Sequence, residues 1–335
     1  IAAVEYSSHG AHDSDASRTP GEGPCEHDGA SIVAASAVMR QLLDRAQSHA
    51  NSQHLLLLSG EHGTGKERLA RWIHARSRRR EQPFVTVRCD AIEANRLVEL
   101  FFGGENAIAP GLVERASGGT LFLRNVVSLP AWFQRLLAKT VRSGAIARGG
   151  DRTPGRSPAR LIASIALDRE GNRTAGELAD ELRQSLGAAR LRLPPLRARR
   201  RDIRPLIAVL GQEAAADRSL ARPWSRLSYS EDALRILQTH NWMGNVQELK
   251  NWVRRLFVVV REPLVTAADL VELAQAHLEC DVDDSAPQRN RPRSSFAAVS
   301  PLMLAMGGLS ASAAQGPSAY VGCRGPFSMS GAETS

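Results

Sequence analysis

The sequence has few cysteines and no long apolar segment. Its four cysteines stand far apart in the chain: Cys25, Cys89, Cys280 and Cys323. This scarcity argues against a disulfide framework and a zinc ribbon, so we expect a reducing, cytoplasmic environment. Apolar runs such as 55–58 and 256–260 have the length of core segments rather than membrane spans. The residues after Ile1 form neither a basic nor an apolar stretch, and we expect no signal peptide.

Lysine is also scarce. The chain has 43 lysines and arginines against 35 aspartates and glutamates, but only Lys66, Lys139 and Lys250 are lysines. The net charge of +8 permits contact with nucleic acid or an acidic partner without requiring either. With 43% hydrophobic and 23% charged residues, the 335-residue chain has the composition of a globular protein that needs no membrane.

The two ends of the chain differ in composition from its middle. Residues 1–30 and 279–335 are rich in Ser, Gly and Pro without periodicity, and we expect disordered tails there. From 31 to 200, short apolar strands alternate with helical segments, which predicts an α/β domain with a parallel sheet of about five strands and flanking helices. Residues 201–278 show only helical periodicity and predict a small all-helical domain.

The expected elements can be stated residue by residue. The strands are 54–59, 84–89, 120–124, 160–166 and 189–193. The helices are 38–50, 66–78, 130–141 and 175–186 in the first domain and 203–217, 230–240, 245–260 and 266–277 in the second. Ser230 and Thr266 are residue types that cap helix N-termini, and we expect them in that role.

A glycine-rich loop joins the first of these strands to the next helix. Its residues are Gly60, Glu61, His62, Gly63, Thr64, Gly65, Lys66 and Glu67. The glycines let successive N–H groups point inward, the helix N-terminus adds positive potential, and Lys66 can reach the outer phosphates of a nucleotide. We therefore expect this segment to bind ATP or ADP. Glu67 stands where many phosphate loops offer Ser or Thr to Mg²⁺, which puts magnesium binding in doubt.

Further motifs follow the loop in a fixed order. They are Ile73-His74, Pro83-Phe84-Val85, Glu99-Leu100-Phe101, Gly118-Gly119-Thr120-Leu121-Phe122-Leu123, Leu193-Pro194-Pro195-Leu196-Arg197, Asp202-Ile203 and Trp242-Met243-Gly244-Asn245-Val246. With the glycine loop, they resemble the AAA+ domain of sigma-54-dependent bacterial enhancer-binding proteins over about residues 31–277. The chain is most similar to the nitrogen-regulation response regulators, some of which also lack the loop that contacts the sigma factor. The resemblance implies a P-loop AAA+ domain with a helical lid in a bacterial transcription regulator of two-component systems.

The positions that this resemblance implies for catalysis hold other residue types. They are Arg124, Asn125, Ala166, Ala179, Ser185 and Gln247. In the family the first two are an Asp that helps to hold magnesium and a Glu that polarises the attacking water, roles that neither Arg nor Asn can fill. The others correspond to an Asn that senses the γ-phosphate, two trans-acting arginines and a lid arginine that grips the γ-phosphate. Arg183 lies near the trans-acting positions but off register.

These changes predict a fold that binds nucleotide without turning it over. Loss of one arginine finger alone can cost roughly 1,000-fold in rate. We expect a pseudo-ATPase that regulates transcription through partners: RNA polymerase, a sigma factor or another regulator subunit. Assembly into a homo-oligomer stays open. The alternatives are an active ATPase that uses other carboxylates, such as Asp90 or Glu99, and an interaction scaffold that binds no nucleotide.

Arg124 has two interpretations. It lies near the β- and γ-phosphates and replaces part of the charge of magnesium, or it pairs with Glu61 or faces solvent. The segment 104–110 is shorter than the sigma-contacting loop of the family and lacks its Phe-Thr tip, and 281–335 lacks the helix pair of a DNA-binding domain.

Other residues suggest sites that we do not favour. The basic run after Pro195 comprises Arg197, Arg199, Arg200, Arg201 and Arg204. It favours a solvated or interdomain patch over a DNA-binding site, which would show steep salt dependence. The spacing of His9, His12, Cys25 and His27 matches no usual metal site. His74 is expected to pack a helix and His62 to replace a small loop residue, so neither is a candidate for catalysis.

Overall fold

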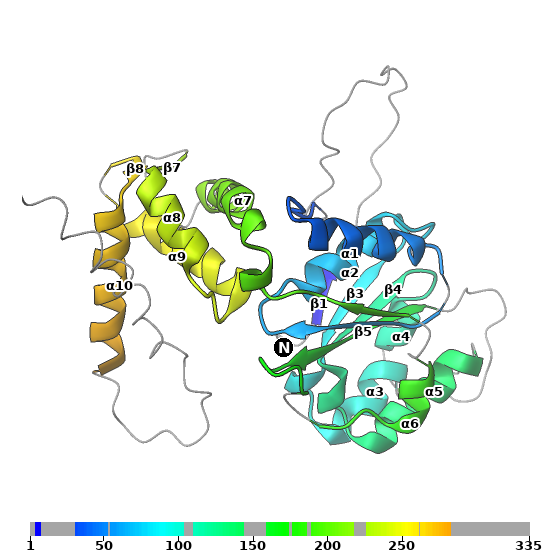
Figure 1. Ribbon diagram of the computed structural model, residues 1–335. Coiled ribbons are helices and arrows are strands. Elements are labelled where there is room, and N and C mark those ends of the chain that lie inside the picture. Colours follow the sequence, from blue (N-terminus) through cyan, green and yellow to red (C-terminus); the bar gives the residue numbers. More distant parts are fainter. Residues whose placement is uncertain are drawn as a thin grey trace, which may run out of the picture. The chain divides into compact units, whose positions relative to one another are not determined.

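The chain forms an α/β domain followed by a helical domain (Figure 1), as its strand and helix patterns predict. The computed structural model describes residues 4–7, 31–52, 54–103, 110–143, 159–173, 176–185, 189–217, 226–260 and 262–282. All structural statements below refer to these residues.

The α/β domain is built on a six-stranded sheet with the strand order β1-β3-β4-β5-β2-β6. The strands are β1 (Val4–Ser7), β2 (Leu56–Glu61), β3 (Phe84–Arg88), β4 (Thr120–Arg124), β5 (Arg160–Leu167) and β6 (Arg190–Arg192). Strands β3, β4, β5, β2 and β6 are parallel, and β1 is antiparallel to β3. The predicted five-stranded parallel sheet is therefore present, with one additional strand at its edge.

The edge strand β1 corrects one expectation. It lies in the segment that the composition assigns to a disordered tail, but Val4 pairs with Val87 and Ser7 with Phe84. Four residues are too few to show an alternating pattern, and the hydrogen-bonding partner lies about 80 residues away, so no local signal predicts this strand. The remainder of 1–30, and everything after Val282, lies outside the described residues.

Helices cover both faces of the sheet. Alternate strand residues point to opposite faces, and because apolar side chains stand on both, each face is packed against helices. On one face, Leu56 and Leu58 pack with α1 (Ala37–Ser48) and α2 (Lys66–Ala75). On the other face, Leu55 and Leu57 belong to the core formed with the remaining helices of the domain. These are α3 (Leu97–Phe102), α4 (Leu112–Arg115), α5 (Ala131–Ser143) and α6 (Asp180–Ser185). Figure 1 shows the two layers of helices on either side of the strands.

The helical domain comprises four helices and a two-stranded ribbon among the described residues. Its elements are α7 (Ile203–Ala216), β7 (Ser228–Tyr229), α8 (Glu231–Thr239), α9 (Asn245–Val259), β8 (Leu264–Val265) and α10 (Ala267–Val282). The Ser230 hydroxyl accepts from the N–H of Ala233 at 3.2 Å, and the Thr266 hydroxyl accepts from the N–H of Asp269 at 3.4 Å. Both expected N-caps are confirmed. Helix α10 extends four residues past 278, the expected end of the domain.

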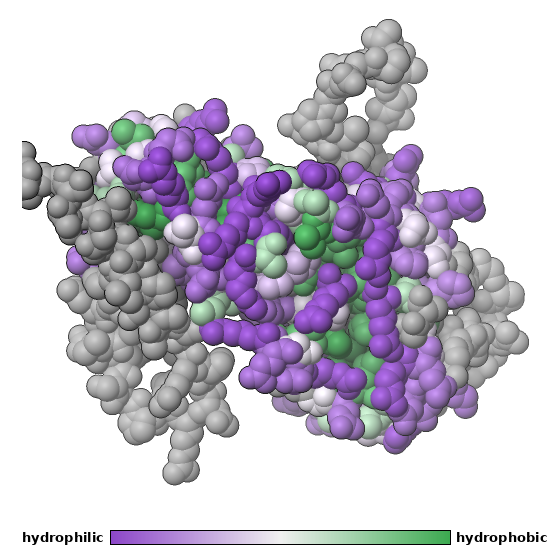
Figure 2. Space-filling view, in the orientation of Figure 1, coloured by the Kyte–Doolittle hydropathy of each residue, from purple (hydrophilic) through white to green (hydrophobic). Residues whose placement is uncertain are grey.

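The surface in view in Figure 2 is mainly hydrophilic, with hydrophobic residues in small areas between charged ones. The large exposed apolar side chains are spread over several elements: Val38, Val98, Trp132, Val258, Val259 and Leu264. Scattered exposure of this kind is ordinary for a globular protein. In the part of the chain that the structure describes, no helix has the length and apolar character needed to cross a bilayer.

Candidate functional site

The glycine-rich loop lies where the sequence predicts it, between the end of β2 and the start of α2. Gly63 and Gly65 have φ angles of 73° and 98°, a left-handed conformation that glycine adopts without strain. A Cβ atom on Gly63 would lie 2.1 Å from the carbonyl oxygen of Gly244, so only glycine fits against the helical domain here. The N-cap Gly65 has no side chain, which leaves the first N–H groups of α2 to an anionic ligand.

Two backbone carbonyls of the loop hold the side chain of Lys66. Its Nζ atom donates to the carbonyl oxygens of Gly60 and Glu61, each at 2.8 Å. Burial, and then the positive charge of Arg124, lowers the pKa of Lys66 to about 8, although Glu61 acts in the opposite direction. An anionic phosphate at this point would stabilise the ammonium form and replace the carbonyl contacts with stronger, charge-assisted ones.

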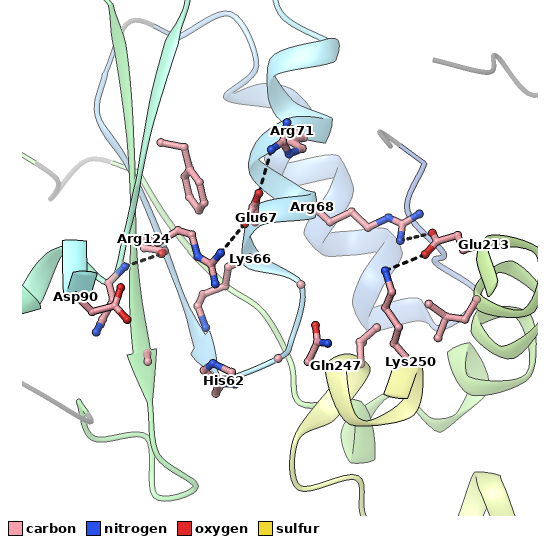
Figure 3. Close-up of a pocket in the computed structure, with 18 residues that line it drawn as sticks. His62, Lys66, Glu67, Arg68, Arg71, Asp90, Arg124, Glu213, Gln247 and Lys250 are labelled. Carbon is pink, nitrogen blue, oxygen red and sulfur yellow. Dashed lines mark hydrogen bonds and ion pairs between the residues drawn. The ribbon is translucent and has the colours of Figure 1, made fainter. Parts of the chain in front are cut away.

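A cavity of about 560 Å³ opens between the loop and the helical domain. Its volume is in the range of small-molecule and cofactor sites. Of the eight loop residues predicted to bind nucleotide, five line it: His62, Gly63, Gly65, Lys66 and Glu67. Gly60, Glu61 and Thr64 are not among the lining residues and hold the loop in place instead. Figure 3 shows Lys66, Glu67 and Arg124 on one side of the cavity and Gln247 and Lys250 on the other.

Four of the six altered catalytic positions line the same cavity: Arg124, Asn125, Ala166 and Gln247. The other two do not. Ala179 donates its N–H to Gln134 Oε1 at 2.8 Å, and Ser185 donates its hydroxyl to the carbonyl of Glu181 at 2.8 Å. The nearby Arg183 pairs with Asp180 on its own helix. Positions 179 and 185 are therefore engaged in local structure around α6.

Arg124 pairs with Glu67, which neither interpretation of the sequence specified. Its Nη1 atom lies 3.1 Å from Glu67 Oε2, while Arg71 Nη2 lies 3.1 Å from Glu67 Oε1. The predicted pairing of Arg124 with Glu61 is wrong, because Glu61 is bound elsewhere. The Arg124 side chain is 39% exposed and lines the cavity rather than facing bulk solvent alone.

Glu61 is bound by Arg197, a residue from the basic run. The guanidinium donates to both carboxylate oxygens, at 2.7 and 2.5 Å, and Asn245 Nδ2 donates to Oε2 at 3.2 Å. Burial alone would raise the pKa of Glu61, but the Arg197 and Asn245 hydrogen bonds and the Arg197 charge outweigh it and the pKa is lowered. Arg197, from the run expected to form a solvated or interdomain patch, thus binds the loop itself.

Arg199 supports the loop from the protein interior. It is 4% exposed and donates to the carbonyl oxygen of Thr64 at 2.8 Å. Burial lowers its pKa to about 10, and the charge of Asp202 opposes this shift. Asp202 is fully buried and accepts from the N–H and the hydroxyl of Ser36, at 2.6 and 2.9 Å. The expectation of a solvated patch is therefore wrong for Arg199. The sequence of such a run does not show which of its arginines are buried and which are exposed.

Asn245 joins the helical domain to the loop. It has a φ of 58° and is fully buried. Its side chain accepts from the N–H of Leu196 at 2.8 Å and donates to the carbonyl of His62 at 2.9 Å. The motif around residues 242–246 marked this position only through its resemblance, and the residue's structural role follows from these bonds.

The helical domain also supplies charge to the cavity, which the sequence reasoning missed. Gln247, at the expected lid-arginine position, donates from its side chain to Asn251 at 3.2 Å. Lys250, one turn further along α9, lines the cavity and lies 3.3 Å from Glu213 Oε2. Glu213 Oε1 lies 2.9 Å from Arg68 of α2, so this carboxylate bridges the two domains. The 3.6-residue helical period places 247 and 250 on one face, which is the signal that points to Lys250.

Of the two histidines, His74 packs in the core as expected, and His62 lines the cavity. His74 is buried, its Nδ1 lies 2.9 Å from the Thr120 hydroxyl, and its ring packs against Phe84. Burial, with the charges of Lys66 and Arg124, lowers the pKa of His62.

Two sequence hypotheses fall largely outside the described residues. They concern the cluster His9, His12, Cys25 and His27 and the segment 104–110, of which 104–109 are not described. Within the part of the chain that is described, no group of three or more His, Cys, Asp or Glu residues could hold a metal ion. Of the two alternative carboxylates, Asp90 lines the cavity, whereas Glu99 does not.

These features define the class of the domain. The domain has the arrangement of a P-loop with a lid: a buried parallel strand, a glycine loop, a lysine beside it and a helix N-terminus, next to a helical domain.

Comparison with known proteins gives the family. Residues 32–192 match the Sigma-54 interaction domain, and residues 197–286 match the AAA+ ATPase lid domain. The chain belongs to the sigma-54-interaction AAA+ family. It is 31% identical to the DNA-binding transcriptional regulator NtrC of Rhizobium meliloti over 280 residues, which cover 82% of this chain and 56% of that protein. It is 34% identical to a Nif-specific regulatory protein of Rhizobium leguminosarum bv. trifolii, with 72% and 69% covered.

Solved structures agree with this assignment. NtrX from Brucella abortus in complex with ADP superposes with a TM-score of 0.60 at 31% identity, covering 71% of this chain and 55% of that one. The same protein in complex with ATP gives a TM-score of 0.61 at 28% identity, covering 84% and 61%. The chain thus spans little more than half the length of several relatives.

Proposed function

We propose that this chain is the nucleotide-binding module of a sigma-54-interaction-type transcription regulator, which binds ATP or ADP and does not hydrolyse it. The observation that carries the proposal is the Arg124–Glu67 ion pair at 3.1 Å beside Lys66. A guanidinium at the end of β4 cannot ligate a metal, and Asn125 beside it has no carboxylate to orient water. Binding is supported by the loop, by Lys66 and by the nucleotide complexes of NtrX.

The regulatory part of the proposal rests on the family. Relatives of this chain include NtrC and Nif-specific regulators, so we propose a cytoplasmic regulator that acts on transcription through partners. RNA polymerase, a sigma factor or another regulator subunit would be the partner. Nucleotide occupancy would affect that partner through the contacts that join the loop to the helical domain. These contacts are made by Arg197, Asn245 and Glu213.

The test is a comparison of binding with turnover. The full chain should bind ATP saturably, Lys66→Ala should abolish that binding, and phosphate release should stay at the level of the Lys66→Ala variant. Phosphate release that is well above that level and disappears in Lys66→Ala would refute the loss of hydrolysis. The absence of saturable binding would refute the nucleotide site and leave the interaction scaffold.

One observation favours a second candidate function, an active ATPase. Asp90 lines the cavity, its side chain is 48% exposed, and its ion pair with Arg88 is long, at 3.6 Å. A carboxylate so placed could orient a water molecule. Turnover that Asp90→Asn abolishes, with ATP binding retained, would establish this candidate.

A further inference from the structure

The end of the cavity next to Lys66 carries an unusual set of charges. Glu67 is the first residue after the loop lysine, and both of its carboxylate oxygens are engaged by guanidinium groups, from Arg71 and Arg124, at 3.1 Å each. Figure 3 shows the chain of contacts from Arg71 through Glu67 to Arg124, with Lys66 beside it. Most phosphate sites of this fold class hold a divalent cation in this region.

The donor set present here does not fit a magnesium ion. Magnesium needs oxygen ligands in near-octahedral geometry and is usually held by one or two carboxylates together with phosphate oxygens. Arg124 offers only N–H donors, and the oxygens of Glu67 already accept from two arginines. Asp90 lies 3.6 Å from Arg88, whose positive charge opposes a cation at that carboxylate. The described residues therefore present positively charged N–H donors where a metal site would need oxygen ligands.

The charge of this surface nevertheless suits a polyphosphate. An aspartate with a bound divalent cation would contribute a net charge of about +1 at the end of β4. Arg124 contributes the same net charge without a metal, and its planar donor fork matches phosphate oxygens. Because the side chain is 39% exposed, it is free of the tight packing that fixes Arg199. Arg71 remains beside Glu67 to compensate that carboxylate if Arg124 leaves it.

We propose that the site takes a nucleoside polyphosphate without a divalent cation, and that Arg124 moves from Glu67 to the outer phosphates when the nucleotide binds. The proposal rests on the proposed function only in requiring that nucleotide binds. The metal-free nucleotide is then the preferred ligand, because its magnesium complex brings two more positive charges toward Arg124. Glu67 acts as a competitor that holds Arg124 until phosphate replaces it.

The first experiment measures the affinity of the full chain for ATP and ADP by equilibrium titration, with a chelator and with excess Mg²⁺. We expect saturable binding in chelator and weaker apparent affinity in magnesium. Binding that requires magnesium would overturn the metal-free proposal and keep the nucleotide site. Binding in neither condition would overturn both.

Substitutions at the ion pair then test the role of Arg124. Arg124→Gln should weaken binding in chelator by about 10- to 100-fold, the range for the loss of a charge-assisted hydrogen bond. Glu67→Gln should tighten it, because the competitor for Arg124 is gone. Weaker binding in both variants, or unchanged binding in Arg124→Gln, would overturn the proposal.

Arg88→Gln is the matched control. Arg88 pairs in register with Arg124 on the neighbouring strand, is 46% exposed and does not line the cavity. Its substitution should change the affinity by less than about twofold, since Arg88 does not line the cavity and its guanidinium pairs with Asp90. Arg124→Asp provides the converse test, because a carboxylate at this position should make binding depend on magnesium. If that variant does not fold, the wild-type titration and the Gln variants still decide the matter.

Discussion

The affinity for ATP should fall as pH rises through about 8, because Lys66 loses its proton there. Burial lowers the pKa of this lysine to about 8 in the free protein, and the nearby Arg124 contributes to the shift. An anionic phosphate favours the ammonium form, so binding raises the pKa again and takes up a proton wherever the free lysine is neutral. Linkage then requires that affinity decreases with pH above the pKa of the free protein.

The size of the effect follows from the same pKa. If only the protonated lysine binds phosphate, about 90% of the protein is competent at pH 7 and about 10% at pH 9. The apparent dissociation constant should therefore rise about tenfold between these two values. The terminal phosphate of the nucleotide completes its ionisation near the lower end of this range, which strengthens binding as pH rises and therefore cannot produce the expected fall in affinity.

The assay is equilibrium titration in chelator at half-unit steps from pH 7 to pH 9.5. Lys66→Ala should show no saturable binding at any pH in this range. An affinity that stays constant within about twofold would refute the reasoning, since it would place the pKa of Lys66 near its ordinary value.

Loss of folding must be excluded as a cause of the decline. The lowered pKa of Lys66 means that the folded protein binds fewer protons than the unfolded chain above pH 8, so this group makes stability rise with pH. Burial raises the pKa of Cys89, so the folded protein keeps a proton that the unfolded chain loses above about pH 8.5, and this group makes stability fall. The two effects oppose each other, and urea unfolding at each pH would verify that the protein stays folded.

Three further predictions concern buried polar contacts, two of them at the loop, and all are measured by urea unfolding. Asn245→Ala should lower the free energy of unfolding by about 3 kcal/mol, because it removes buried hydrogen bonds and strains a positive φ. Asn245→Gly should lower it by about 1 kcal/mol less, because glycine adopts this φ without strain. Equal losses in the two variants would show that φ is unimportant. A double-mutant cycle of Glu61→Gln and Arg197→Met should give a coupling of about 1 to 3 kcal/mol, and simple additivity would argue against a bidentate pair. Arg160→Met should lower the free energy of unfolding by about 2 kcal/mol, since this buried guanidinium donates to the carbonyls of Ala50 and His49, just after α1, at 2.5 and 2.6 Å. A loss below about 0.5 kcal/mol would contradict that role.

Local patterns predicted the elements that carry the site. Strand β4 falls at the expected residues 120–124 because its apolar run is bounded by a glycine pair and by Arg124. The loop geometry followed from glycines whose positive φ angles and close approach to Gly244 permit little else. Strand β1 was missed because its evidence is a pairing with β3, which is distant in the sequence.

The partners of the arginines could not be predicted in the same way, because the chain has 40 of them and the sequence does not show which are buried. Arg124, Arg197 and Arg199 are chemically identical in the sequence but take three different roles at one loop. Arg197 binds the Glu61 carboxylate, Arg199 binds a backbone carbonyl while buried, and Arg124 binds Glu67 from a half-exposed position. The first two are held by burial or by bidentate geometry, so a ligand gains little by competing for them. Arg124 has a single-atom contact at 3.1 Å and an accessible side chain. Among these three, it is therefore the arginine whose partner a phosphate can replace at the lowest free-energy cost.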